Sequence, residues 1–335
     1  LASGTKTYNR MVGMDTTGKP LESILEMAEK KGYATGIITD KEITDATPAA
    51  FYAHSVSRDF ENKIAAQLIE NNTIEVVFGG GARRFIPQNE YLKDYFSYNQ
   101  STGFKKSISS RKDDKNLFET FLSKDYKIVC NRRELINLDK EAEQVVGLFS
   151  TKELSAYIDR DEERTSQPNL VEMTSKGLDV LRNNKNYFVM IEFGRIDTEG
   201  HDNDAGSIYK AVEEMDSGLT VCYNQYKANK DSTLLIFTAD HETGGFNISY
   251  TKLPKGQYYT KKMDNGEIWK NRTDPLLFKD FLLLKKQRRS IYTIFEESKT
   301  PQDLYNKIND NIGYKITRKD AEVITNFLKE YRKSK

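Results

Sequence analysis

Short apolar runs rich in β-branched residues alternate along the first 240 residues with longer stretches of helical periodicity. The strand-like runs are ATGIITD (34–40), IEVVFGGG (74–81), YKIVCN (126–131), QVVGLFS (144–150), YFVMIEF (187–193) and STLLIFTAD (232–240). The helical stretches are LESILEMAEKKG (21–32), RDFENKIAAQLIENN (58–72), NLVEMTSKGLDVLRNN (169–184) and a long segment over roughly 205–229. This alternation predicts an α/β fold with a mostly parallel central sheet flanked by helices.

Residues 251–335 follow a different pattern. The segment KLPKGQYYTKKMDNGEIWKNRTDP (252–275) precedes helical stretches rich in Lys, Gln, Asn and Asp, with no run like the core strands. We therefore expect an α/β core over residues 1–250. Residues 251–335 are expected to form a mainly helical insertion or appendage on the same domain, at the C-terminal end of the chain.

Composition narrows the possible partners. The chain has 335 residues, of which 30% are charged, and a net charge of +1 without a polybasic block. Neither nucleic acid nor a membrane is therefore an expected partner, and no stretch has the apolar length of a transmembrane helix. Cys130 and Cys222 match no zinc-finger spacing. The sequence leaves open whether they are two unpaired thiols or form one disulfide.

Polar residues follow directly after three of the predicted strands. The segments are GIITDKEITDATPAAFYAHSVSRD (36–59), VMIEFGRIDTEGHDND (189–204) and LIFTADHETGG (235–245). In open parallel sheets, ligands bind beyond the carboxyl ends of the strands. Polar clusters at three such ends therefore predict a single functional site.

The residue types in these clusters are those of metal ligands. Asp197 and His201 are four residues apart, on one face of a helical turn, and Asp240 and His241 are adjacent at a strand end. Mixed carboxylate and imidazole ligands suit zinc, whereas Glu192 with a threonine hydroxyl suits magnesium. The alternatives are a solvent-exposed pair for the first two residues and a turn or helix cap for the second two.

Two other features have weaker functional interpretations. GGGARRF (79–85) resembles a phosphate-cradling glycine loop, but it has neither the GxxxxGK[ST] nor the GxGxxG pattern. His54 lies four residues before Arg58 on a predicted helix, and we interpret it as a structural residue.

Four segments together resemble the alkaline phosphatase family. They are GTKTYN (4–9), TDATPAAFYAHSVSRD (44–59), EFGRIDTEGHDND (192–204) and TADHETGG (238–245). Their order, spacing and flanking apolar strands all agree with that family. The resemblance covers roughly residues 1–250, and it implies the fold of an alkaline phosphatase for the predicted α/β core.

The resemblance implies a role for each matching residue. Asp240 and His241 match ligands of the zinc that holds the nucleophile. Asp197 and His201 match ligands of a second zinc, and Glu192 and Thr47 match ligands of one magnesium; Thr198 leaves the metal of that third site open. Asp45 matches a carboxylate beside the magnesium ligands, and Arg58 matches the arginine that binds phosphate. A guanidinium donates two hydrogen bonds to two phosphate oxygens, which suits this last role.

The implied activity is hydrolysis of small-molecule phosphate monoesters through a phosphoserine intermediate, with two Zn²⁺ and one Mg²⁺ as cofactors. The family's nucleophilic serine would fall about seven residues before Leu1, and its third histidine ligand of the second zinc would follow His241. We therefore expect a fragment that is inactive alone. Family members are usually exported to the periplasm or beyond and are often homodimers, so we expect a periplasmic or secreted protein that forms a homodimer.

Two other functions remain open. A phosphodiesterase or a phosphomutase of the same superfamily shares metal ligands of this type, although TADHETGG and DATPAAFYAH (45–54) favour the monoesterase. A non-catalytic protein that binds phosphate or metal is the alternative from a different class. Metal analysis and an assay with a chromogenic phosphate ester would separate these functions.

Overall fold

The computed structural model describes residues 1–70, 73–96, 107–160, 166–245, 250–252, 255–271, 273–275 and 278–334. The chain forms two compact units. Unit 1 comprises Leu1–Arg195 and Ala211–Asp240, and unit 2 comprises Ile196–Lys210 and His241–Lys335. The units therefore do not divide at residue 250, and the predicted assignment of 251–335 as an appendage on the core domain stays a prediction.

Unit 1 is built around a five-stranded parallel sheet. Its strands are β1 (Ala34–Glu42), β2 (Val76–Gly80), β3 (Lys127–Val129), β4 (Val145–Leu148) and β5 (Tyr187–Glu192). Their order across the sheet is β3-β4-β2-β1-β5, and all four neighbouring pairs are parallel. The predicted α/β fold with a mostly parallel sheet is thereby confirmed, and the five strands coincide with five of the six predicted runs.

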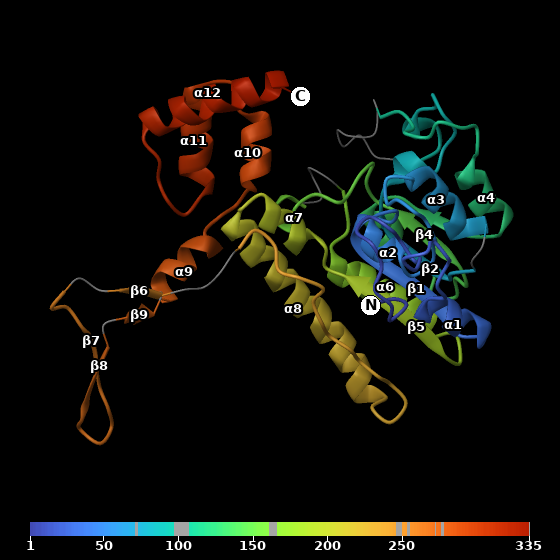
Figure 1. Cartoon of the computed structure of the whole chain (residues 1–335), viewed down its shortest axis with the longest axis horizontal. Coiled ribbons are helices and arrows are strands. Elements are labelled where there is room, and N and C mark those ends of the chain that lie inside the picture. Colours follow the sequence, from blue (N-terminus) through green and yellow to red (C-terminus); the bar gives the residue numbers. More distant parts are fainter. Residues whose placement is uncertain are drawn as a thin grey trace. The chain divides into compact units, whose positions relative to one another are not determined.

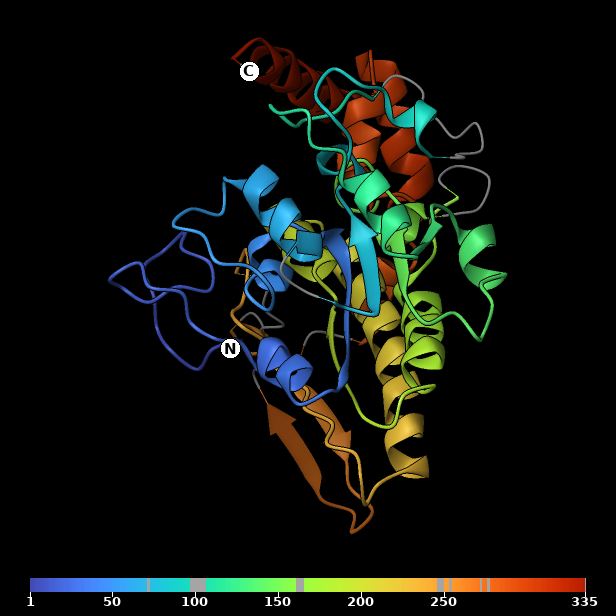
Figure 2. The same ribbon diagram turned by 90° about the vertical axis from the view of Figure 1, so that its right-hand side faces the viewer.

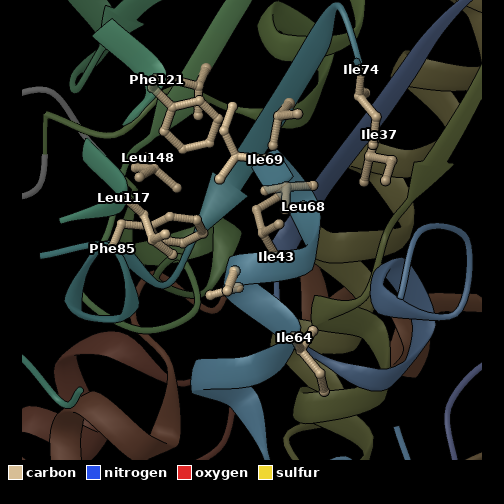
Figure 3. Packing of buried hydrophobic residues seen from close by; sticks show 14 of the residues in the cluster. Ile37, Ile43, Ile64, Leu68, Ile69, Ile74, Phe85, Leu117, Phe121 and Leu148 are labelled. Atoms are coloured by element: carbon tan, nitrogen blue, oxygen red, sulfur yellow. The ribbon is translucent and has the colours of Figure 1, made fainter. Parts of the chain in front are cut away.

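Helices cover both faces of this sheet (Figure 1). The helices of unit 1 are α1 (Ile24–Lys30), α2 (Ala46–Ala49), α3 (Glu61–Glu70), α4 (Leu117–Ser123), α5 (Arg132–Ile136), α6 (Leu170–Leu181) and part of α8 (Ala205–Ala228), with short 3₁₀ turns η1 (Ala82–Arg84), η2 (Leu92–Asp94) and η3 (Tyr157–Asp159). Successive residues of β1 point to opposite faces, so Ile37 packs in one core cluster and Ile38 in the other. Figure 3 shows the first cluster, where Ile64 and Leu68 of α3 and Phe121 of α4 belong to the same buried group as Ile37.

Local signals explain where the main helices begin. Ser23 caps α1, and its hydroxyl accepts from the backbone N–H of Glu26, whose carboxylate accepts from the N–H of Ser23. Asn169 and Glu172 form the same reciprocal pair at the start of α6. Each pair satisfies two N–H groups that a helix end otherwise leaves without a partner. Both helices lie within predicted helical stretches: α1 begins three residues inside 21–32, and α6 begins one residue inside 169–184.

Unit 2 is mainly helical beyond residue 277, as predicted. Its helices are α9 (Phe278–Lys285), α10 (Ile291–Glu297), α11 (Pro301–Asn311) and α12 (Arg318–Ser334), together with most of α7 (Arg195–His201) and the first turns of α8. Ile294, Leu304 and Ile308 lie at the centre of its small core. In the described part of the chain, no helix combines the length and apolarity needed to cross a bilayer.

Two small antiparallel sheets precede these helices, and the sequence pattern did not predict them. β6 (Tyr250–Lys252) pairs with β9 (Thr273–Pro275), and β7 (Tyr259–Lys262) pairs with β8 (Ile268–Asn271) (Figure 2). The turn between β7 and β8 contains Gly266 at a φ of 87°. Asn-Gly is a strong signal for a tight hairpin turn, because both residues tolerate positive φ. Apolar periodicity alone misses such ribbons when their side chains are exposed.

The prediction of a buried strand over 232–240 is wrong. Residues 233–239 have no regular secondary structure, and Leu234 is 83% exposed. Among the described strands, β5 pairs with β1 and ends the sheet. The apolar, β-branched residues of this run favour an extended backbone. A strand also needs a neighbouring strand that pairs with its N–H and C=O groups, and the sequence pattern does not specify that neighbour.

Candidate metal and phosphate site

The carboxyl ends of β1 and β5 bring the first predicted ligand into place. Parallel register pairs Thr39 with Glu192. The Thr39 hydroxyl donates to Glu192 Oε2 over 2.6 Å and accepts from the backbone N–H of Lys41 over 2.9 Å. Burial raises the pKa of the Glu192 carboxyl to about 7, against the hydrogen bond from Thr39, and the negative charges of Asp40 and Asp45 add to the rise. The partial removal of this carboxyl group from water disfavours its charged form.

Helix α2 places Asp45, Thr47 and, through an ion pair, Arg58. Asp45 is the N-cap of α2 and accepts from the N–H of Ala46 over 2.8 Å, and Thr47 lies within this short helix. The guanidinium of Arg58 donates to Asp45 Oδ1. The structure therefore brings together the residue predicted to bind phosphate and the carboxylate predicted beside the magnesium ligands. Arg58 is partly exposed, and its fork stays accessible to an anion.

Alternating charges surround this group. Lys41 Nζ lies 2.8 Å from Glu153 Oε2 and 3.8 Å from Asp45 Oδ2. Arg195 Nη1 lies 2.7 Å from Glu153 Oε1. Burial alone would lower the pKa of Lys41, but attraction to Glu153 and a hydrogen bond with it raise that pKa above its usual value. Lys41 therefore remains positively charged next to the predicted magnesium ligands.

A buried ion triad lies directly behind the end of β1. Arg160 donates to Asp40 Oδ2 and to Glu214 Oε1, each over 2.9 Å, and all three side chains are 1% exposed. Asp40 Oδ1 also accepts from the backbone N–H of Arg195 over 3.0 Å, and Glu214 accepts from the N–H of Leu170 over 2.6 Å. The triad ties the end of β1 to α6 and to the part of α8 in unit 1.

Unit 2 brings together three of the predicted zinc ligands. Asp197 and His201 lie on α7, with His201 Nε2 3.5 Å from Asp197 Oδ1. The Thr243 hydroxyl donates to Asp197 Oδ1 over 2.6 Å, and it also lies 3.1 Å from His241 Nδ1. Thr243 therefore joins His241 to Asp197 across 46 positions of sequence.

Two glycines make this approach possible. Gly244 has a φ of 73°, and a Cβ on it would lie 2.0 Å from the carbonyl oxygen of Gly200. A Cβ on Gly200 would lie 2.9 Å from the carbonyl oxygen of Thr243. Both positions need the small size of glycine, and Gly244 also needs its freedom at positive φ. The glycines of the TADHETGG motif thus serve close packing against α7.

The predicted site residues fall into two sets. Unit 1 holds Asp45, Thr47, Arg58, Glu192 and the exposed Asp240, and unit 2 holds Asp197, His201 and His241. Within each unit, the described residues contain no group of three or more His, Cys, Asp or Glu side chains close enough to hold a metal ion by themselves. The assembly of both sets into one metal site stays a prediction.

The donor atoms of the predicted ligands are of the types that magnesium and zinc prefer. Glu192, Asp45 and Thr47 offer oxygen atoms only, as magnesium prefers. Asp197 and the imidazoles of His201 and His241 form the mixed oxygen and nitrogen set that zinc prefers.

The glycine run at 79–81 serves packing in this structure. A Cβ on Gly80 would lie 2.0 Å from the carbonyl oxygen of Lys152. The N–H of Gly81 donates to that same oxygen over 2.9 Å, and the N–H of Ala82 donates to Ser150 over 3.0 Å. A phosphate cradle needs N–H groups that point at the ligand. The structure therefore favours packing over the phosphate-loop interpretation.

His54 and the cysteines have structural surroundings. His54 Nε2 lies 2.9 Å from Glu26 Oε1, and its Nδ1 lies 2.7 Å from the carbonyl oxygen of Gly13. Both ring nitrogens are thus engaged, which agrees with the structural interpretation of this residue. Neither Cys130 nor Cys222 is part of a disulfide, so of the two possibilities for them the structure does not show the disulfide.

Sequence reasoning missed the residues that support the predicted ligands. These are Thr39, Lys41, Glu153, Arg195 and Thr243. Thr39, Lys41 and Thr243 lie inside the polar segments already identified at the strand ends, so their position was a usable signal. Glu153 lies in no such segment, and only the folded chain shows its contact with Lys41 and Arg195.

Comparison with known proteins places the chain in a family. The alkaline phosphatase family model matches residues 1–326. Alkaline phosphatase 4 of Bacillus subtilis is 34% identical over 254 residues, which cover 74% of this chain and 48% of that protein. The crystal structure of Thermus thermophilus alkaline phosphatase matches with a TM-score of 0.80 and 27% identity, over 98% of this chain and 61% of that one.

A more distant match is a mutant of TAB5 alkaline phosphatase with Mg bound. It has a TM-score of 0.58 at 24% identity, over 82% of this chain and 69% of that one, and shows the fold alone. The chain spans about half the length of the curated relatives it matches. The family match, by contrast, extends over nearly the whole of this chain, including the segments that carry the predicted ligands. The chain therefore belongs to the alkaline phosphatase family.

Proposed function

We propose that the complete protein hydrolyses phosphate monoesters through a phosphoserine intermediate at a site with two Zn²⁺ and one Mg²⁺. One observation carries this proposal: the hydroxyl of Thr243 contacts both Asp197 and His241. Two motifs of the family that are far apart in sequence thus meet at the side chains predicted to bind zinc. An exposed ion pair and an unrelated turn would not require this meeting.

The side chains of this chain then have distinct tasks. Arg58 would donate two hydrogen bonds to the phosphate, and Asp45 would hold its guanidinium in place through the observed ion pair. Glu192 and Thr47 would hold Mg²⁺, and Asp197, His201, Asp240 and His241 would hold Zn²⁺. When bound, the metal ions lower the pKa of an attacking hydroxyl and offset charge on the phosphoryl oxygens.

The proposed substrates are small-molecule phosphate monoesters. Export to the periplasm or beyond and a homodimer are proposed from the family resemblance. A net charge of +1 provides no general attraction for nucleic acid or anionic membranes.

The test is an assay of the full-length gene product with a chromogenic phosphate monoester and, in parallel, the matching diester. We expect the monoester to be hydrolysed faster, the activity to be lost with a chelator, and Zn²⁺ with Mg²⁺ to restore it. Arg58→Ala should lower kcat/KM by about a hundredfold, as expected when charged donors to a reacting phosphate are removed. Arg182→Ala, at an exposed helical ion pair with Asp179, is the matched control and should change little.

Preference for the diester would favour the phosphodiesterase alternative, and metal binding without turnover would favour the non-catalytic one. The 335-residue chain assayed beside the full-length product tests the separate prediction that this chain alone is inactive. Turnover by the chain at the rate of the full-length product would contradict that prediction.

A further inference from the structure

Lys41 occupies a constrained position between the proposed magnesium ligands and their neighbours. Its side chain is 14% exposed, and Nζ lies 2.8 Å from Glu153 Oε2 and 3.8 Å from Asp45 Oδ2. Its stem packs over Gly194, where a Cβ would lie 2.3 Å from Lys41 Cγ and 3.0 Å from Glu192 Oε1. The missing side chain of Gly194 thus makes room for both the lysine stem and the glutamate carboxyl group.

Several carboxylates lie around Lys41, and a positive charge among them offsets their mutual repulsion. Glu192, Asp45 and Glu153 contribute carboxylates to one neighbourhood. Arg195 pairs with Glu153, and Arg58 pairs with Asp45 from a more exposed position. The Lys41 ammonium lies against Asp45 and attracts Glu192 as well. A positive charge held inside a group of carboxylates stabilises them and repels any second cation that approaches them.

We propose that Lys41 is a built-in counter-ion of the magnesium site, which stabilises Asp45 and Glu192 without metal and weakens the binding of a divalent cation. This inference rests on the proposed function, because that function places Mg²⁺ at Glu192 and Thr47. Lys41 is thus a positioning residue, and the affinity of the site for Mg²⁺ reflects a competition between Lys41 and the metal.

The competition predicts two changes of opposite sign when the charge is removed. Lys41→Met keeps the length of the stem and removes the ammonium. We expect the Kd for Mg²⁺, measured by calorimetric titration of the 335-residue chain, to fall by about tenfold or more, because a repulsive charge a few ångströms away is lost. The melting temperature of the metal-free chain should fall. Lys41→Arg keeps the charge and should restore both values toward those of the wild type.

A merely structural role for Lys41 predicts something else. Loss of packing would disorder the ligands, so Lys41→Met would both melt earlier and bind Mg²⁺ more weakly. Weaker or unchanged Mg²⁺ binding by Lys41→Met therefore overturns the proposal. Lys30→Met, at an exposed pair with Glu22, is the matched control and should leave the Kd unchanged.

A second variant tests the same competition in the opposite direction. Glu153→Gln removes the carboxylate that lies 2.8 Å from Lys41 Nζ and leaves the ammonium less compensated. We expect the Kd for Mg²⁺ to rise severalfold, and an unchanged or lower Kd would overturn the proposal even if Lys41→Met failed to fold. Glu192→Gln separates the two levels of inference. If the wild type, Glu192→Gln and Lys41→Met all fail to bind Mg²⁺ at millimolar concentration, the magnesium site of the proposed function is refuted together with this inference. If Mg²⁺ binding depends on Glu192 but not on Lys41, this inference alone is refuted.

Discussion

Replacing Arg160 by methionine should destabilise unit 1 strongly and in a pH-dependent way. The substitution removes hydrogen bonds of 2.9 Å to Asp40, 2.9 Å to Glu214 and 2.6 Å to the carbonyl oxygen of Ser155. Methionine fills most of the volume, so the main consequence is electrostatic. Two carboxylates that are 1% exposed lose their shared cation and keep the backbone N–H donors of Arg195 and Leu170.

The expected loss in the free energy of unfolding depends on how the two carboxylates respond to the removal of Arg160. Breaking a buried ion pair by removing one partner costs about 3–5 kcal/mol. Glu214 escapes this cost by taking up a proton, which at pH 7 costs about 3–4 kcal/mol for a carboxyl group with an ordinary pKa near 4.5. The two values agree, so we expect a loss of about 3–5 kcal/mol in the free energy of unfolding at pH 7.

The pH dependence has a definite sign. Without Arg160, burial raises the folded-state pKa of Glu214 further above the unfolded value. The penalty is therefore largest above the folded pKa and shrinks as the pH falls toward the unfolded pKa, by about 1.4 kcal/mol per pH unit for each group that takes up a proton. The deficit of Arg160→Met relative to the wild type should accordingly be clearly smaller at pH 5 than at pH 7.

The assay is urea denaturation followed by far-ultraviolet circular dichroism at pH 7 and pH 5, with hydrogen exchange of peptides from β1 and α6 to locate the change in unit 1. Lys30→Met is the control, because Lys30 is 74% exposed and its pair with Glu22 is worth about 0–1 kcal/mol. A loss below about 1 kcal/mol for Arg160→Met, or a loss independent of pH, would refute the reasoning from burial of the triad.

Three further predictions concern other parts of the chain. His54→Gln should destabilise the chain more at pH 6 than at pH 9. The hydrogen bond with Glu26 raises the pKa of His54 above 6.5. The stabilisation by this pair is therefore present below pH 6.5 and disappears as the pH rises through the pKa of His54 in the folded chain. Equal losses at both pH values in urea denaturation would contradict this. Gly244→Ala should cost about 1–3 kcal/mol and increase hydrogen exchange around α7, because a Cβ would lie 2.0 Å from the carbonyl oxygen of Gly200; Gly245→Ala, with open space around its Cβ, should leave α7 unchanged. Asp204→Asn should speed hydrogen exchange at the start of α10, because the buried carboxylate accepts from the N–H of Ile291 over 2.6 Å, and an unchanged rate there would show that this contact does not hold α10.

Much of the core of unit 1 could be predicted from the sequence. A parallel strand that is buried on both faces reads as a continuous apolar run, and β2 and β4 do so. The same rule failed for residues 232–240, where the run is apolar but lies exposed. It also failed for the β7–β8 hairpin, where residues 260–270 are exposed and the main signal is the Asn-Gly turn.

The candidate site could be predicted as a set of residue types but not as a set of contacts. Glu192, Asp197 and His241 were identified from their place after strand-like runs. The support for Glu192 comes from Thr39, 153 positions earlier, through the register of two parallel strands. Register depends on how whole strands pack, so a local pattern cannot specify it.

The sequence by itself determined the elements of the parallel sheet, the polar residues at their carboxyl ends and the family to which the chain belongs. These properties follow from residue type and spacing over a few residues, where periodicity and turn chemistry act. Only the tertiary structure decided that Arg160 meets Asp40 across 120 positions and that Lys41 lies among the carboxylates of the candidate magnesium site. The physical reason is that such contacts form only when distant segments are buried together. The interaction energy of an ionic group depends on its burial and on partners that are distant in the sequence.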